Sequence, residues 1–194
     1  MLSEKVKSTK RELIILEASK LFKEKGFGGA TMRDLAERVG IEAASMYNHI
    51  RSKDEILEEI CFGIGRKYDE QLAEIDQTKI TCSEKIEAII AFHIQMIIDD
   101  SNAVSVLNND WKFLNSEKMV EFKTMRNEYE KHLAAIITKG IEEGAFKPIN
   151  VSVALFTLLS SLRWVELWYK PSRGMSKEEL AKDISAILMN GIKA

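Results

Sequence analysis

The stretch Thr31–Lys53, TMRDLAERVGIEAASMYNHIRSK, contains the pattern that decides the fold. Thr31 and Asp34 have the three-residue spacing of a capping box, which predicts that a helix begins directly after Thr31. Gly40 can adopt the left-handed backbone conformation, and it predicts the end of that helix. A second short helix is expected over roughly residues 43 to 49. Two short helices joined by a tight turn that contains glycine predict a helix-turn-helix.

The second short helix has the composition of a DNA-recognition helix. Met46 is expected to be its inward-facing anchor, and Ala36 of the preceding helix is small where the two helices must cross. The other faces offer small or hydrogen-bonding side chains: Ala43, Ala44, Ser45, Tyr47, Asn48 and His49. Such side chains suit a helix that enters a DNA major groove of about 12 Å width. The stretch therefore predicts a DNA-binding unit.

The composition of the whole chain predicts an all-helical protein. Its 194 residues include only two prolines, 30% are charged, and no Val/Thr-rich alternating run suggests a strand. This length is enough for one or two domains with a substantial core. No signal-peptide pattern is present, and no apolar run approaches the roughly 20 residues needed to span a bilayer. The expectation is a cytoplasmic protein that does not associate with a membrane.

Residues that could carry catalysis or bind a metal are scattered along the chain. Cys61 and Cys82 form no CxxC motif and are expected to be reduced thiols. The histidines His49, His93 and His132 show no metal-ligand spacing. An all-helical enzyme would need a nucleophile-base pair, a metal cluster or a phosphate-binding loop, and the sequence offers none. We therefore expect no metal, no cofactor and no enzymatic activity.

The net charge of −2 conceals a difference between the two ends of the chain. Residues 1 to 53 carry 11 Lys/Arg against 7 Asp/Glu, whereas residues 54 to 194 carry 17 against 23. A basic N-terminal third and an acidic remainder suit a protein that binds DNA at one end only. The asymmetry gains weight because it coincides with the helix-turn-helix.

The helix-turn-helix is expected to belong to a three-helix domain over residues 1–52. Its first helix should extend from about Ser8 to Lys25 and end at Gly26, after a mobile arm over residues 1–8. A further helix should begin at Lys53, where its N-terminal amides and the lysine would favour a DNA phosphate.

The remaining chain, residues 53–194, is expected to be a second helical domain, giving about nine helices in all. Capping boxes and apolar periodicity place helices at residues 53–75, 82–99, 102–110, 116–143, 150–169 and 177–193. The last two are too apolar for the surface of a monomer, and the first of them alone contains Leu155, Phe156, Leu159, Trp164, Leu167 and Trp168. Pairing two copies would bury them in a four-helix interface, which predicts a homodimer.

The segment VGIEAASMYNHIRSKDEIL closely resembles the DNA-binding signature of TetR/AcrR-type transcriptional regulators. The matching positions are Gly40, Ile41, Tyr47, His49, Lys53 and Leu57. Ala44 stands where the family prefers glycine, and Ile50 where it prefers phenylalanine. The resemblance implies a homodimer on the double-stranded DNA of a palindromic operator. It also implies that residues 53–194 form a ligand-binding and dimerisation domain, whose small-molecule effector releases a repressor from DNA.

The resemblance also assigns roles to residues by position. It implies phosphate contacts for Thr31, Tyr47, His49 and Lys53, and base-facing positions for Ala43, Ala44, Ser45 and Asn48. Two alternatives stay open: Tyr47 could pack against Ile14 or Leu57, and Thr31 could serve only as a helix cap. A repressor and an activator would use the same DNA-binding unit.

The C-terminal half resembles TetR-family regulators of fatty-acid and acyl-CoA metabolism. The segments that carry this likeness are RNEYEKHLAAIITKGIEEGAF and WVELWYKPSRGMSKEELAKDI. It implies a hydrophobic effector, such as an acyl-CoA, bound by Phe92, Met96, Trp111, Phe113 and Tyr129, with Arg126 near the CoA phosphates. Alternatively these aromatic and methionine side chains form only core. The protein would then be a dimeric helix-turn-helix DNA-binding protein without small-molecule control.

Overall fold

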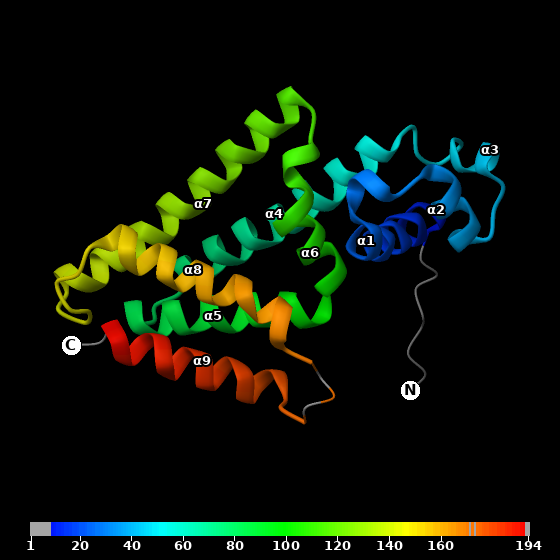
Figure 1. Cartoon of the computed structure of the whole chain (residues 1–194). Coiled ribbons are helices and arrows are strands. Elements are labelled where there is room, and N and C mark those ends of the chain that lie inside the picture. The colour runs from blue at the N-terminus through cyan, green and yellow to red at the C-terminus, as the bar shows by residue number, and fades with distance from the viewer. Residues whose placement is uncertain (1–8, 171, 173, 193–194) are drawn as a thin grey trace, which may run out of the picture. The chain divides into compact units, whose positions relative to one another are not determined.

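The computed structural model describes residues 9–170, 172 and 174–192, and in this part of the chain every regular element is helical. The predicted all-α fold is confirmed, with nine α-helices among the described residues (Figure 1). They are α1 Lys10–Gly29, α2 Met32–Val39, α3 Ala43–Met46, α4 Lys53–Gln77, α5 Cys82–Asp99, α6 Ser101–Asp110, α7 Ser116–Glu142, α8 Val151–Trp168 and α9 Lys177–Ile192, with a 3-10 turn η1 at Trp111–Phe113. The arm expected over residues 1–8 lies outside the described residues.

The described chain divides into two compact units. The first comprises residues 9–64 and 102–120, and the second comprises residues 65–101 and 121–192. Helix α4 contributes its beginning to the first unit and its remainder to the second. The domain boundary between residues 52 and 53 stays a prediction, and the compact units divide further along, inside α4.

Side-chain caps fix the beginnings of the first two helices. Thr9 and Glu12 form a capping box at α1, so the helix begins two residues later than the predicted Ser8. The predicted capping box of Thr31 and Asp34 at α2 is confirmed. Gly40 ends α2 in the left-handed conformation, with a φ of 70°, as predicted.

Helix α3 is shorter than the sequence predicts. It covers Ala43–Met46, and residues 47–49 form tight turns in place of helix. Glu42 provides no side-chain cap, and the amide of His49 donates to the carbonyl of Met46 at 3.0 Å, three residues back. This tightening brings Ile50 into the core, where it is buried. The predicted inward anchor Met46 is confirmed, because its side chain is fully buried.

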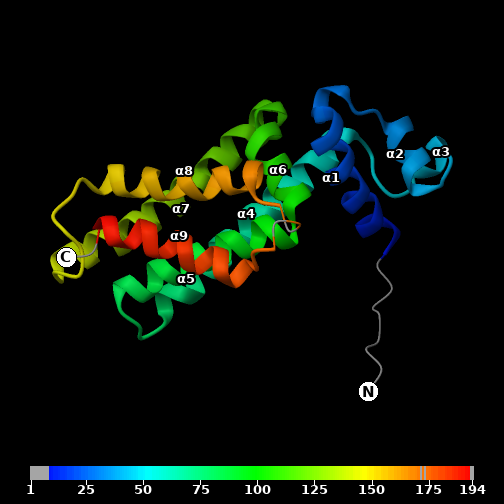
Figure 2. The same cartoon turned by 60° about the horizontal axis from the view of Figure 1, so that its bottom comes forward.

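In the second unit, α5 packs against both α8 and α9 (Figures 1 and 2). The predicted capping box of Thr81 and Glu84 begins α5. Asn150 caps α8, since its side chain accepts a hydrogen bond from the amide of Val153. The buried side chains of α5 recur every three or four residues, as in a helix, and include Ile86, Ile90, Ile94 and Ile97. The hydrophobic periodicity read from the sequence is therefore the pattern that closes this core.

Gly140 of α7 lies against the ring of Phe146, so a β-carbon at this position would be 2.3 Å from two ring atoms. Phe146 is buried and has little freedom to move away. We expect Gly140→Ala to lower the free energy of unfolding by about 1–3 kcal/mol, measured by urea denaturation. Gly63→Ala is the matched control, because a β-carbon there meets nothing within 4 Å. A Gly140→Ala variant as stable as the Gly63→Ala variant would contradict this packing.

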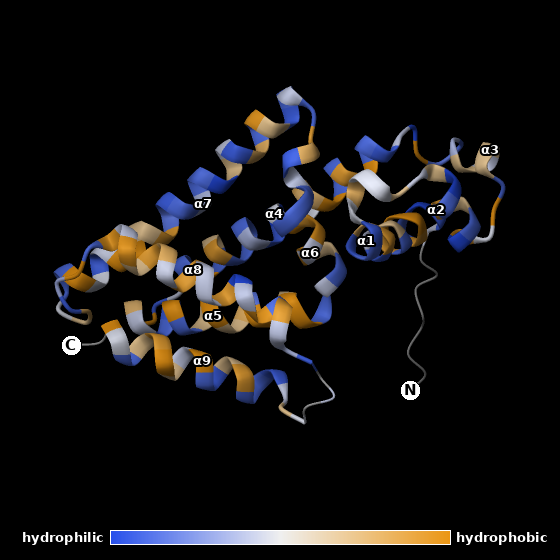
Figure 3. Cartoon of the chain, in the orientation of Figure 1, coloured by the Kyte–Doolittle hydropathy of each residue, from blue (hydrophilic) through white to orange (hydrophobic). Residues whose placement is uncertain are grey.

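Helix α8 corrects one expectation from the sequence. Its 18 residues would extend about 27 Å, and its composition is apolar enough to cross a bilayer, so the statement that no apolar run approaches that length was wrong. Figure 3 shows hydrophobic positions along much of α8. Part of this apolar surface faces the core, through Ala154, Leu158 and Val165, and part of it is exposed. The exposed part is the surface that needs a partner.

Candidate functional site

The surface of α3 and the turn after it is open to solvent. Ala43, Ala44 and Ser45 are exposed on α3, and Asn48 and His49 are exposed in the turn. Tyr47 is 55% exposed, whereas Ile14 and Leu57 are fully buried, so the tyrosine has most of its side chain outside the core. Met46 is buried on the opposite side of this segment, so all six predicted recognition side chains are exposed.

Thr31 and Asp34 are bound to each other at the start of α2. The amide of Asp34 donates to Thr31 Oγ1 at 3.1 Å, and the hydroxyl of Thr31 donates to Asp34 Oδ2 at 2.7 Å. Lys25 adds an ion pair with Asp34 at 3.0 Å. The hydroxyl of Thr31, followed by Lys25, lowers the pKa of Asp34 to about 2. Thr31 is thus a helix cap, and its predicted phosphate contact stays a prediction.

Because the pKa of Asp34 is lowered, the free energy of unfolding of the first unit should depend on pH in the acid range. The folded state holds the carboxylate ionised at a pKa of about 2, below the ordinary value of 3.8. Its contribution is complete above pH 4 and is lost as the pH falls towards 2. We expect Asp34→Asn to lower the free energy of unfolding at pH 6 and to change it less at pH 2. Equal effects at both pH values in thermal unfolding would contradict this assignment.

Lys53, the first residue of α4, is bound to the backbone at the end of α1. Its Nζ donates to the carbonyl oxygens of Phe27 at 2.7 Å and Ala30 at 2.8 Å. The ammonium also lies 4.3 Å from the centre of the Phe27 ring. An ammonium has three donors, so one remains for another acceptor. The predicted phosphate contact of Lys53 stays a prediction.

A half-buried polar cluster lies in the second unit, among side chains of α4, α5 and α7. His93 Nε2 and the hydroxyl of Tyr129 are 2.7 Å apart, and the Tyr68 ring stacks on the His93 ring at 4.4 Å. The Phe92 ring meets Tyr68 edge-on at 5.9 Å. Burial lowers the pKa of His93 to about 4 and raises the pKa of Tyr68 and Tyr129. These three groups are therefore neutral at pH 7.

The six residues predicted to bind a ligand are divided between the two units. The structure brings Phe92 and Tyr129 together around Tyr68, and it buries Met96 in the same unit. Arg126, also in the second unit, is exposed and pairs with Glu130 at 3.3 Å. Trp111 and Phe113 belong to η1 in the first unit. Their ligand-binding roles stay predictions.

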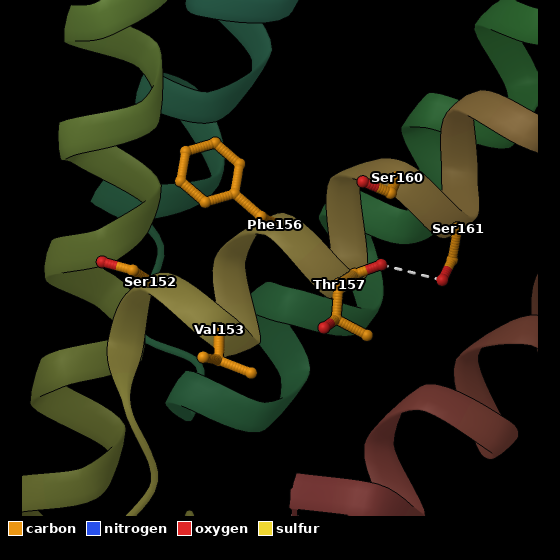
Figure 4. A pocket seen from close by; sticks show the side chains of 6 residues that line it. All are labelled: Ser152, Val153, Phe156, Thr157, Ser160 and Ser161. Carbon is orange, nitrogen blue, oxygen red and sulfur yellow. Dashed lines mark hydrogen bonds between the residues drawn. The ribbon is translucent and has the colours of Figure 1, made fainter.

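One side of α8 exposes large apolar side chains. Trp164 is 62% exposed and Leu167 is 63% exposed, and Val153, Phe156 and Trp168 are also exposed. Leu155, predicted among the interface residues, instead lies in the core of its own chain. A shallow groove of about 550 Å³ lies on this helix (Figure 4). Its lining residues are Ser152, Val153, Phe156, Thr157, Ser160 and Ser161.

Comparison with protein families assigns both parts of the chain. Residues 14–60 match the family described as bacterial regulatory proteins, tetR family, and residues 79–192 match the tetracyclin repressor-like C-terminal domain. The chain belongs to the TetR family. The predicted resemblance is confirmed, and the helix-turn-helix is the DNA-binding motif of a TetR-family transcriptional regulator.

Relatives of this TetR-family chain match it over almost its whole length. The transcriptional repressor KstR2 of Rhodococcus jostii is 26% identical over 189 residues, which cover 96% of this chain and 92% of that protein. The structure of the ketosteroid transcriptional regulator KstR2 of Mycobacterium tuberculosis covers all of both chains with a TM-score of 0.92 at 21% identity. AibR in complex with isovaleryl coenzyme A and operator DNA has a TM-score of 0.84 at 21% identity, covering 93% of this chain and 98% of AibR. These two structures share the fold.

Three arginines near the TetR-family recognition segment were not predicted as functional residues. Arg11 donates to the carbonyl of His49 at 2.7 Å and pairs with Glu55 and Glu59 of α4. It therefore anchors the turn after α3. Arg33 on the first turn of α2 and Arg51 before α4 are exposed. Their positions beside the predicted phosphate contacts Thr31 and Lys53 in the sequence could have identified both.

Proposed function

We propose that the protein is a homodimeric TetR-family repressor that binds a palindromic operator through α3 and acts in the cytoplasm. The observation that carries this proposal is the exposed segment from Ala43 to His49, held by the buried Met46. Small side chains allow the backbone of this segment to approach base edges in the major groove. The Rhodococcus jostii relative, a named repressor, supports the repressor role.

Within this proposal, the contacts divide by chemistry. Ala43, Ala44, Ser45 and Asn48 face the bases, and Thr31, Tyr47, His49 and Lys53 contact phosphates. Arg33 and Arg51 are exposed, lie near Thr31 and Lys53 in the sequence, and add two phosphate contacts. Hydroxyl, imidazole and cationic donors suit phosphate oxygens, which carry most of the affinity and its salt dependence.

The exposed face of α8 forms the dimer interface in this proposal. Its apolar side chains would leave a monomer with a continuous hydrophobic surface, which soluble proteins usually cover. A two-fold dimer buries the same surface of each copy. It also presents two copies of α3 to half-sites about one turn of DNA apart.

A small hydrophobic effector, such as an acyl-CoA, regulates DNA binding in this proposal. The resemblance of the C-terminal half to acyl-CoA-responsive regulators supports it, and so does the structural likeness to AibR, which was solved with isovaleryl coenzyme A. Phe92, Met96 and Tyr129 supply apolar surface, and the neutral His93 and Tyr68 beside them could hydrogen-bond a polar group of the effector. Without such an effector, the chain would be a dimeric DNA-binding protein only.

Fluorescence anisotropy on a duplex that the protein selects from random DNA tests the proposal. Isovaleryl-CoA and palmitoyl-CoA are each added to the complex, with free CoA as the matched control. The proposal expects at least one acyl-CoA, but not CoA, to weaken DNA binding by about tenfold or more, the usual range of allosteric coupling. If neither acyl-CoA changed the DNA affinity, the result would favour the alternative of a dimeric DNA-binding protein without acyl-CoA control. Failure to select any duplex would remove the DNA-binding function itself.

A further inference from the structure

The end of α1, residues 27–29, follows a kink at Gly26 and begins with Phe27. Gly26 breaks the helix with a φ of 71°, and Ala30 follows as the cap before Thr31 begins the helix-turn-helix. Phe27 is buried, and its ring meets Phe22 of α1 edge-on at 5.3 Å. This end of α1 leads directly through Ala30 to Thr31, the cap of α2.

Two further segments of the first unit hold Phe27. The first is the beginning of α4, where Lys53 donates hydrogen bonds to the carbonyls of Phe27 and Ala30 and lies over the Phe27 ring. The other is the end of α6 with η1, more than 80 residues along the chain. Asp110, the last residue of α6, accepts a long hydrogen bond of 3.5 Å from the amide of Phe27. The Phe113 ring in η1 lies 5.6 Å from the Phe27 ring, tilted by 30°.

Asp110 is a buried acidic residue at the end of α6. It is only 7% exposed, and a carboxylate taken out of water needs hydrogen-bond donors. Burial raises its pKa, while the amide of Phe27 acts against that rise. The Phe113 side chain is 45% exposed, and its ring contacts the buried Phe27 ring. A large apolar side chain is therefore partly exposed to solvent where η1 meets Phe27.

We propose that Asp110 and Phe113 are positioning residues for DNA binding, because they hold the end of α1 at Phe27, which leads into Thr31 and α2. Neither residue needs to touch DNA for this role. The inference rests on the proposed function for its DNA readout, but the contact with Phe27 can be measured on the protein alone. It makes the end of α6 a determinant of DNA affinity.

Amide hydrogen exchange and DNA binding test the proposal on Asp110→Ala and Phe113→Ala in the full-length protein. Asp110→Asn keeps an acceptor oxygen, and Asn109→Ala is the control, because Asn109 is exposed and bonds to Ser105 of its own helix. We expect the Phe27 amide to exchange about tenfold faster in Asp110→Ala, with recovery in Asp110→Asn. On the selected duplex, both alanine variants should bind about tenfold more weakly with an unchanged salt slope, since no phosphate contact is lost.

The outcomes separate this inference from the proposed function. Lower thermal stability with parental DNA affinity and parental exchange at Phe27 would mean a purely structural role and would overturn the proposal. If the effects of the two alanine substitutions on DNA binding simply added in the double variant, they would not act through the same residue, and the shared role of Phe27 would be wrong. If the parental protein selected no duplex, the proposed function would fail, and the exchange rate at Phe27 would still decide whether Asp110 holds the end of α1.

Discussion

Replacing Trp164 and Leu167 together by glutamate is expected to convert the protein to a monomer at micromolar concentration. Both side chains are more than 60% exposed on α8, so the change should leave the folded chain intact. In the proposed dimer each substitution occurs twice, and each carboxylate would be buried without a partner. Loss of apolar burial and the cost of burying charge together predict a dimer dissociation constant raised about a thousandfold or more.

Sedimentation equilibrium measures this effect, and operator affinity should fall with it because one α3 per particle reaches only one half-site. Val120→Glu is the control, since Val120 is an equally exposed apolar residue outside α8. A double variant that sediments as the parental protein does would show that α8 is not the interface.

Ala44→Glu is expected to weaken operator binding by about a hundredfold or more. Ala44 is exposed on α3 with no room for a carboxylate between this helix and the bases in the proposed complex. A negative charge inside the groove is also repelled by the phosphates. Alanine and glutamate are both good helix formers, so thermal stability should stay nearly unchanged.

Ala91→Glu is the matched control for this substitution, because Ala91 is also exposed on a helix but lies on α5. Fluorescence anisotropy should show parental affinity for this control. Comparable affinities for the Ala44→Glu and Ala91→Glu variants would exclude α3 as the recognition helix.

Local sequence signals predicted most of the fold. The caps of Thr31, Thr81 and Asn150 and the left-handed Gly40 act within a few residues of themselves, so their effect can be read from spacing. Periodicity placed the core faces for the same reason. The exposure of the recognition residues could be predicted because the short helix has one large apolar side chain, Met46, to face the core.

Contacts between distant segments could not be predicted in this way. Lys53 has the position of a phosphate contact, and in the structure its ammonium also binds the carbonyls of Phe27 and Ala30 at the end of α1. Arg11 reaches the carbonyl of His49, 38 residues away, and Asp110 reaches Phe27 from α6. Nothing in the spacing of these residues indicates the pairings, because they depend on how helices pack. For the same reason the sequence does not indicate that Trp111 and Phe113 belong to a different compact unit from Phe92 and Tyr129, and their shared ligand-binding role stays a prediction.

Selection of binding sites from random duplex DNA tests the central claim most directly. A dimer that presents two copies of α3 predicts an enriched inverted repeat whose half-site centres lie about 10 base pairs apart or a small multiple of that spacing. Two chains should bind each selected duplex. Enrichment of a single unrepeated site, or no enrichment at low salt, would contradict the account.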